Sequence, residues 1–272
     1  MRKLVGIIMI AIALFFLALI GKSAFTLPST QKQLKEAVFV EDGKLLPENE
    51  GKLVVVFGSL EASSNARDED LGLTLPSPIA VRYVEQFRVR EDSSGWKAGW
   101  DPITEASTEW LKQARLYGDL GFGDYELSEE LLRGFPAGRE LTLSLLDADE
   151  VSALEEYVDV VESGGVVYFS EAPISCFSNR TLTALDLDYS GLRRVHYKYL
   201  EQKSGDTYAV AGIQQGNRLV RDESLDASPV FEGARTPEDV IRQNSTGTLL
   251  GMALAAVACL LLIFFGVRRI RG

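Results

Sequence analysis

The sequence has few of the residues that usually build metal and redox sites. It contains one histidine, His196, and two cysteines, Cys176 and Cys259. A single histidine excludes a zinc site made of several histidines, and it leaves a Ser/His/Asp triad only one possible base. No G-x-S-x-G elbow accompanies His196. From the sequence we therefore expect no catalytic residues, no metal and no cofactor.

Carboxylate clusters are present, but none has the spacing of a calcium loop. They are Asp186 with Asp188, and Asp147 with Asp149 and Glu150. An EF-hand needs a central glycine and a distant glutamate, and both clusters lack this pattern. Helix capping and solvated surface are the favoured interpretation.

Charge is absent from two long apolar runs, Leu4–Ile20 and Leu249–Val267. At about 1.5 Å rise per residue these runs span roughly 25 Å and 28 Å as helices, against a hydrocarbon core of about 30 Å. Arg2 and Lys3 precede the first run, and three arginines follow the second. By the positive-inside rule, both basic flanks face the cytoplasm. We therefore expect an integral membrane protein with two transmembrane helices and cytoplasmic termini.

Each run has an alternative interpretation. The first could be a cleaved signal peptide, although it exceeds the usual hydrophobic region and no A-x-A site follows it. The second could be a buried core helix, although its apolar perimeter is uninterrupted. Under the membrane interpretation the middle of the chain is periplasmic or extracellular in a bacterium, and lumenal in a eukaryote. The lipid bilayer is then one expected partner.

The segment between the runs is acidic. Five of the 28 Lys and Arg residues flank the runs, which leaves 23 basic against 39 acidic residues and a charge near −16. Such a surface disfavours nucleic acid and anionic lipid headgroups. Cys176 lies in this segment and Cys259 in the second run, so no internal disulfide is expected.

Strand and helix patterns alternate in the central segment, which predicts an α+β fold, mostly antiparallel and strand-rich. In Val81–Arg90, period-two alternation indicates a half-buried strand, with Tyr83 and Phe87 on one face and Arg82 on the other. Further strands are predicted at Lys52–Leu60 and Val166–Phe169. Strands in Thr183–Val220 are expected to form an antiparallel meander, with an apolar face made by Val195, Tyr197 and Tyr199.

Helices are predicted where capping signals meet a helical period. They are expected over Thr104–Gln113, after Ser128, over Ala148–Ser163 and after Thr236-Pro237. The expected organisation is residues 1–21 as a stub and first transmembrane helix, 22–235 as an extracytoplasmic α+β domain, 236–267 as a juxtamembrane and second transmembrane helix, and 268–272 as a basic tail.

Several segments, taken in order, resemble the transmembrane protein 43 family, also called LUMA. They are Pro47–Leu53 with Gly58, Leu75-Pro76, Arg82–Phe87, Thr108–Trp110, Gly191–Tyr199, Gly216–Val220 and Arg242–Ser245. Family members have a first span, a large outer domain and several later spans, whereas this sequence has only one later apolar run. The resemblance implies a shortened relative that organises membrane protein complexes, and no catalytic residue is carried over. It also implies the location, which is a bacterial plasma membrane, or the endoplasmic reticulum or nuclear envelope if the chain is eukaryotic.

Small residues recur every fourth position along the second run, at Gly247, Gly251, Ala255 and Cys259. Such a seam lets helices approach closely, so we expect packing against the first run or a second copy. The alternative is that small residues are simply common in such helices.

Three functional hypotheses follow. The leading one is a non-catalytic, membrane-anchored scaffold or interaction protein, which binds other membrane proteins or itself. The second is an extracytoplasmic sensor or ligand-binding module that signals through a partner helix. The third is an extracytoplasmic hydrolase that uses a serine, His196 and a carboxylate.

Overall fold

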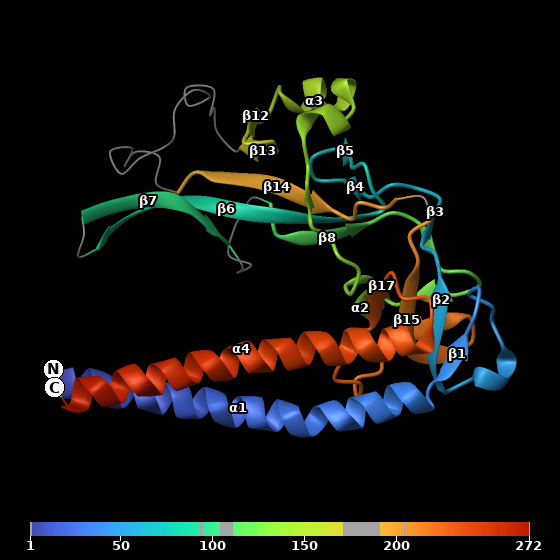
Figure 1. Cartoon of the computed structure of the whole chain (residues 1–272). Coiled ribbons are helices and arrows are strands. Elements are labelled where there is room, and N and C mark those ends of the chain that lie inside the picture. The colour runs from blue at the N-terminus through green and yellow to red at the C-terminus, as the bar shows by residue number, and fades with distance from the viewer. Residues whose placement is uncertain (1, 93–94, 104–110, 171–190, 204, 272) are drawn as a thin grey trace. The chain divides into compact units, whose positions relative to one another are not determined.

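The computed structural model describes residues 2–92, 95–103, 111–170, 191–203 and 205–271. Within its two long helices, the side chains of residues 2–4, 20, 22–29, 245–252, 254 and 270–271 lie outside that description. The chain is α+β and rich in strands (Figure 1). It divides into a first unit of Met1–Ser59, Phe122–Gly134 and Asp206–Gly272, and a second unit of Leu60–Gly121 and Phe135–Gly205.

The first unit contains a six-stranded sheet built around β15. Its order is β1 (Val38–Val40), β2 (Leu53–Gly58), β15 (Tyr208–Gln215), β16 (Arg218–Val220) and β10 (Glu126–Leu127), with β17 (Val230–Glu232) also paired to β15. The β1–β2 and β10–β16 pairs are parallel, and the others are antiparallel. The strand predicted over Lys52–Leu60 is confirmed as β2. Its residues 54–57 are all buried, which explains its uninterrupted apolar sequence.

Both faces of this sheet are covered within the first unit. On one face, Val55 and Ala209 pack with Leu34 and Val240, which come from the long helices. Tyr125 is buried in the same unit, and its hydroxyl donates a hydrogen bond to Gln214 Oε1 at 2.9 Å. The short helices η1 (Pro47–Asn49) and α2 (Glu129–Leu132) complete the unit, and α2 begins after Ser128 as predicted.

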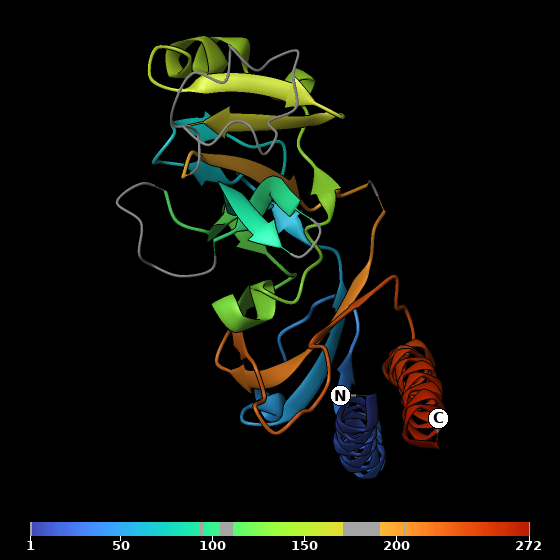
Figure 2. The same cartoon turned by 90° about the vertical axis from the view of Figure 1, so that its left-hand side faces the viewer.

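Two 35-residue helices, α1 (Arg2–Glu36) and α4 (Pro237–Arg271), lie side by side and antiparallel (Figures 1 and 2). The predicted start of α4 is confirmed by a capping box. Asp239 N donates to Thr236 Oγ1, and the Asp239 carboxylate accepts from the backbone N–H groups of Arg235 and Thr236, all at 3.2 Å. This arrangement satisfies amide groups that would otherwise lack partners at the helix start.

The expectation of two transmembrane helices is wrong for the part of the chain that the structure describes. Among those residues, no helix carries an apolar stretch long enough to cross a membrane. The predicted fold class with flanking transmembrane helices, and the integral membrane location with cytoplasmic termini, are corrected accordingly.

The second unit contains a seven-stranded antiparallel sheet. Its order is β12 (Asp159–Ser163), β13 (Val166–Ser170), β14 (Arg193–Tyr199), β6 (Ile79–Asp92) and β7 (Gly95–Pro102), with β11 (Arg139–Glu140) also on β14 and β8 (Ala114–Tyr117) also on β6. Two small ladders join β3 (Glu61–Ala62) to β9 (Leu120–Gly121), and β4 (Arg67–Asp68) to β5 (Leu73–Thr74). The helices are α3 (Ala148–Leu154) and η2 (Leu143–Leu145).

The predicted strands β6 and β13 are confirmed, and so is the apolar face of β14. Val195, Tyr197 and Tyr199 are buried in the core of the unit. Arg82, however, lies on this core face of β6, opposite Tyr197, and is buried. The strand was therefore predicted with its faces reversed at this point, because Ala80 and Val84 belong to the core with Val195, whereas Tyr83 stacks on His196 on the opposite face. The alternation does not reveal that an arginine can face the core when carboxylates meet it there.

The helix predicted over Ala148–Ser163 is wrong in its second half. α3 ends at Leu154, and residues 159–163 form β12, which pairs with β13. Gly164 and Gly165 have φ of 61° and 78°, the left-handed conformations of a two-residue hairpin turn. The glycine pair therefore joins two strands and does not cap a helix.

The expected meander is wrong between β14 and β15, because β14 belongs to the sheet of the second unit and β15 to that of the first. Its last hairpin is confirmed, since β15 and β16 pair antiparallel. Residues 104–110 and 183–190 lie outside the described residues, as do Cys176, Asp186 and Asp188. Both of those aspartates and most of the helix predicted over Thr104–Gln113 therefore lie outside the description, whereas residues 111–113 are described and are not helical.

Tyr208 makes the first unit sensitive to alkali. Burial, followed by the charges of Glu232 and Asp206, raises the pKa of Tyr208 to about 12. Since the folded pKa exceeds the ordinary value of 10.0, the stability from Tyr208 is complete below pH 10 and is lost as the pH rises toward 12. We expect Tyr208→Phe to reduce the alkaline loss of unfolding free energy by up to about 2 kcal/mol, measured by urea unfolding across this range. An unchanged pH profile would contradict the assignment; Tyr157→Phe, at an exposed tyrosine, is the control.

Candidate functional site

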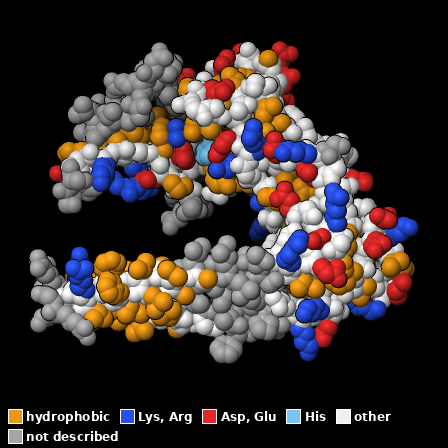
Figure 3. All heavy atoms as spheres, viewed as in Figure 1, with side chains coloured by type: hydrophobic (Ala, Val, Ile, Leu, Met, Phe, Trp, Pro, Cys, Tyr) orange, Lys and Arg blue, Asp and Glu red, His pale blue; other side chains and the backbone are white. Residues whose placement is uncertain are grey.

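The described part of the helix pair exposes a large set of hydrophobic side chains, which we call the apolar helix-pair surface (Figure 3). Each member is at least 37% exposed. The members are Val5, Ile7, Ile8, Ile12, Leu14, Phe15, Phe16 and Leu19 on α1, and Val257, Leu260, Leu261, Phe264 and Phe265 on α4. Together they expose on the order of 1,000 Å² of side-chain surface, if each shows about half of its area, which is about 150–250 Å² for the phenylalanines and smaller for the aliphatic residues.

The two helices meet through small residues. A Cβ atom placed on Gly266 would lie 2.9 Å from the Gly6 carbonyl oxygen and 2.8 Å from Ile10 Cγ1. Ala13 of α1 and Cys259 of α4 are buried as well. Close approach at these positions turns the larger side chains outward, which produces the apolar helix-pair surface.

The predicted seam is only partly within the described residues. Cys259 is buried with 4% exposure, whereas Ala255 is exposed. The side chains of Gly247 and Gly251 lie outside the description. The sequence reasoning missed Gly6 and Gly266, although Gly266 follows Cys259 by seven residues and so continues one helix face.

In the second unit, His196 lies in a row of charged residues on the face of β14 that is opposite the core. His196 Nδ1 is 3.4 Å from Glu140 Oε2, and Nε2 is 3.9 Å from Glu85 Oε1. The ring stacks on Tyr83 at 5.2 Å. With only 12% of its side chain exposed, His196 is not on the solvated face that its charged neighbours suggest.

Ion pairs extend this row in both directions. Arg194 pairs with Glu85 at 2.8 Å, and its guanidinium lies over the rings of Tyr168 and Trp100 at 3.8 Å and 4.1 Å. Burial lowers the pKa of Arg194, which Glu85 opposes. Lys198 pairs with Glu140 at 2.7 Å, and this hydrogen bond raises the pKa of Lys198.

Within the described part of the chain, His196 has no serine partner, so the Ser/His/carboxylate set is not assembled there.

The carboxylates at the start of α3 have structural partners. Asp147 caps the helix by accepting from the N–H groups of Asp149 at 2.9 Å and Glu150 at 3.1 Å. Glu150 accepts from Thr74 N at 2.7 Å and pairs with Arg67 at 2.9 Å. Burial opposes ionisation, but these partners outweigh it and lower the pKa of Glu150. Among the described residues, no group of His, Cys, Asp and Glu is arranged to hold a metal ion.

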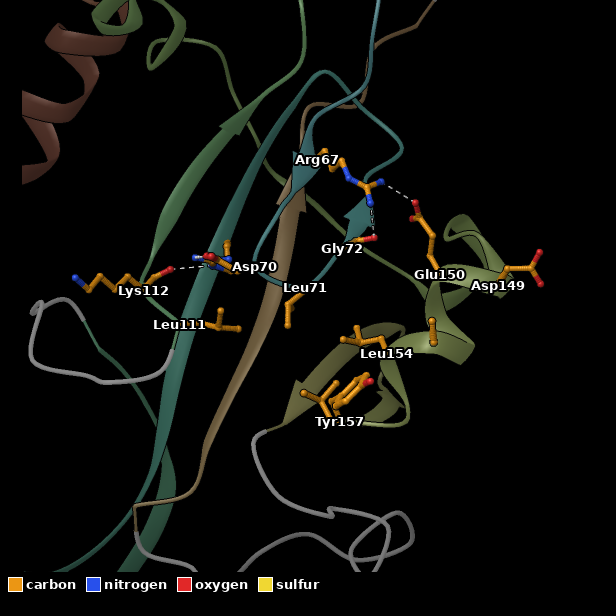
Figure 4. A pocket seen from close by; sticks show the side chains of 13 residues that line it. Arg67, Asp70, Leu71, Gly72, Leu111, Lys112, Asp149, Glu150, Leu154 and Tyr157 are labelled. Atoms are coloured by element: carbon orange, nitrogen blue, oxygen red, sulfur yellow. Dashed lines mark hydrogen bonds and ion pairs between the residues drawn. The ribbon is translucent and has the colours of Figure 1, made fainter.

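Beside α3 lies an open cavity of about 1120 Å³, contained within the second unit (Figure 4). Its lining combines leucines with the paired arginines Arg67 and Arg82. Arg82 Nη1 donates to both carboxylate oxygens of Asp68 at 2.7 Å, and Nη2 donates to Asp70 at 2.7 Å. The lining residues come from distant parts of the chain, so their assembly could not be predicted from local pattern.

No protein-family model matches the chain, and no match was found among curated proteins or solved structures. The resemblance to the transmembrane protein 43 family therefore stays a prediction that rests on the segments quoted for it.

Proposed function

We propose that this protein is a non-catalytic interaction protein that associates with a second copy of itself through the apolar helix-pair surface. The single observation that carries the proposal is that surface. Soluble monomers rarely expose contiguous apolar patches larger than a few hundred Å², and larger ones mark interaction sites. The resemblance to a family of complex organisers supports the same role.

A second copy suits this surface because of its chemistry. Between Val5 and Leu19, and between Ala255 and Val267, the sequence has no charged residue, so the partner surface must be apolar as well. The same surface on another copy meets this requirement, and two identical patches can pair about a two-fold axis.

The exposed apolar area is large enough to drive association of two copies. A standard interface buries about 800 Å² per partner, less than the area of the apolar helix-pair surface. Burying 1,000 Å² contributes at most about 25 kcal/mol, against an association cost of about 4–15 kcal/mol. The surplus remains favourable even if only part of the surface is covered.

Self-association is tested with a double variant, Phe15→Glu with Phe264→Glu. These side chains are 62% and 60% exposed, so the substitutions leave the core intact while placing charge in the interface. We expect the parent chain to form dimers or larger oligomers, and the variant to be monomeric, as measured by size-exclusion chromatography with light scattering. Buried unpaired carboxylates cost several kcal/mol each, so the dissociation constant should rise at least about a hundredfold.

The control is Leu145→Glu, at a side chain that is 45% exposed in the second unit. It introduces the same charge and should leave the oligomer unchanged. A parent chain that stays monomeric at every concentration would overturn the proposal. So would a monomer that instead floats with phosphatidylcholine vesicles, because lipid would then be the occupant of the surface.

A further inference from the structure

The cavity in the second unit has an apolar floor and a helix along one side. Leu71, Leu111 and Leu154 line the floor. α3 and the turn after it contribute residues at helical spacing, namely Asp149 and Glu150, Ala153 and Leu154, then Tyr157 and Val158. One face of this short segment therefore borders the cavity, while Glu155 and Glu156 are outside the lining.

The two arginines of the cavity already have anionic partners. Arg67 pairs with Glu150 (Figure 4), and Arg82 pairs with Asp68 and Asp70. Their positive charge is therefore largely neutralised toward a ligand. The Lys112 side chain extends away from Leu71 and Leu154, and its carbonyl accepts from Arg82 Nε at 2.8 Å.

The accessible charge on the α3 side of the cavity is negative, because Asp149 is exposed there. On the opposite side, Asp70 is 60% exposed but is paired with Arg82 at 2.7 Å. Tyr157 is 80% exposed beside the apolar floor and offers a ring face to a cation. Between Leu141 and Ser170 the sequence contains seven acidic residues and no Lys or Arg, which favours a negative potential on the side of the cavity that α3 forms.

We infer that this cavity binds a basic, amphipathic peptide segment of a partner protein. An apolar side chain of the peptide occupies the floor between Leu71, Leu111 and Leu154, and neighbouring Lys or Arg side chains face Asp149 and the Tyr157 ring on the α3 side. The volume of about 1120 Å³ is at the upper end for ligand pockets and accommodates several side chains. The inference is independent of self-association, because it uses residues of the second unit alone.

The probe is a fluorescent synthetic octapeptide of alternating lysine and leucine, titrated against the full chain by fluorescence anisotropy. We expect saturable binding that weakens with added salt, since the charges at the margin are exposed. Asp149→Lys reverses one marginal charge and should weaken binding about tenfold, and Tyr157→Ala about threefold to tenfold. A glutamate–leucine peptide and a lysine–serine peptide should both bind much more weakly than the probe.

Matched controls locate the binding. Glu156→Lys makes the same charge reversal on an exposed residue outside the lining and should leave the affinity within about twofold of the parent. The double variant Phe15→Glu/Phe264→Glu should bind the peptide normally, which separates the cavity from the apolar helix-pair surface. Equal weakening by Asp149→Lys and Glu156→Lys, equal binding of the acidic peptide, or no binding of the probe would each overturn the inference.

Discussion

Asp68→Ala is expected to lower the free energy of unfolding of the second unit by about 3–5 kcal/mol, the usual loss when one partner of a buried ion pair is removed. The Asp68 side chain is 1% exposed and that of Arg82 is 4% exposed. Asp68 accepts two hydrogen bonds from Arg82 Nη1 at 2.7 Å and one from the Tyr197 hydroxyl at 2.6 Å. Without the carboxylate, a buried guanidinium loses its closest counter-charge and a buried hydroxyl loses its acceptor.

The pKa values of the partners point the same way. Burial lowers the pKa of Arg82, but Asp68 and Asp70 outweigh it, so its pKa is raised and the guanidinium stays charged. Burial, followed by the charge of Asp68, raises the pKa of Tyr197 well above its ordinary value. Asp68 therefore holds one neighbour charged and the other protonated, and its removal affects both.

The measurement is urea unfolding followed by tryptophan fluorescence. All three tryptophans, Trp96, Trp100 and Trp110, belong to the second unit, so the signal reports on that unit. Glu69→Ala is the control, because the Glu69 side chain is 83% exposed and should change stability by less than about 1 kcal/mol. A loss of less than about 1 kcal/mol in Asp68→Ala would contradict the account.

An apolar replacement of the whole network separates charge from packing. Asp68→Leu combined with Arg82→Met and Tyr197→Phe leaves no buried charge, so it should recover most of the stability lost by Asp68→Ala. A triple variant less stable than the single variant would show that shape, and not the unpaired charge, dominates at this position.

The sequence predicts the strands whose pattern is local. β2 has a continuous buried run and β13 a short β-branched run, and both are where period and propensity place them. The sequence also carries a signal for the hairpin of β12 and β13, since Gly164-Gly165 suits a two-residue turn, but the helical spacing of the preceding valines competes with it. Tertiary pairing with β13 decided between the two patterns.

Non-local features could not be read in this way. Arg82 looks solvent-facing because its alternation partners are polar, and Asp68 lies in a polar stretch typical of a loop. Only the folded sheet brings them together, with Tyr197 from far along the chain. The cavity beside α3 is likewise lined by residues that lie far apart in the sequence and meet only in the folded unit. The apolar helix-pair surface, by contrast, follows directly from the uncharged runs, although their interpretation as membrane spans was wrong for the described residues.

Gly123→Ala is expected to destabilise the first unit by about 3 kcal/mol or more, through backbone strain and overlap together. Gly123 and Gly43 pack against each other with φ of 59° and 63°. A Cβ atom on Gly123 would lie 2.5 Å from the Gly43 carbonyl oxygen, which also accepts a hydrogen bond from Asp124 N at 2.9 Å. Because these neighbours are backbone atoms, they cannot move aside as a flexible side chain would.

Gly216→Ala is the matched control for this prediction. Gly216 has a φ of 61°, and nothing lies within 4 Å of its Cβ position, so this variant measures the cost of the left-handed conformation alone, about 1–2 kcal/mol. Both variants are followed by helical circular dichroism during urea unfolding, because the first unit contains the two long helices. The difference between the variants is the cost of the overlap at Gly43. Equal losses in the two variants would mean that the backbone at Gly43 yields freely, contrary to the close packing described for it.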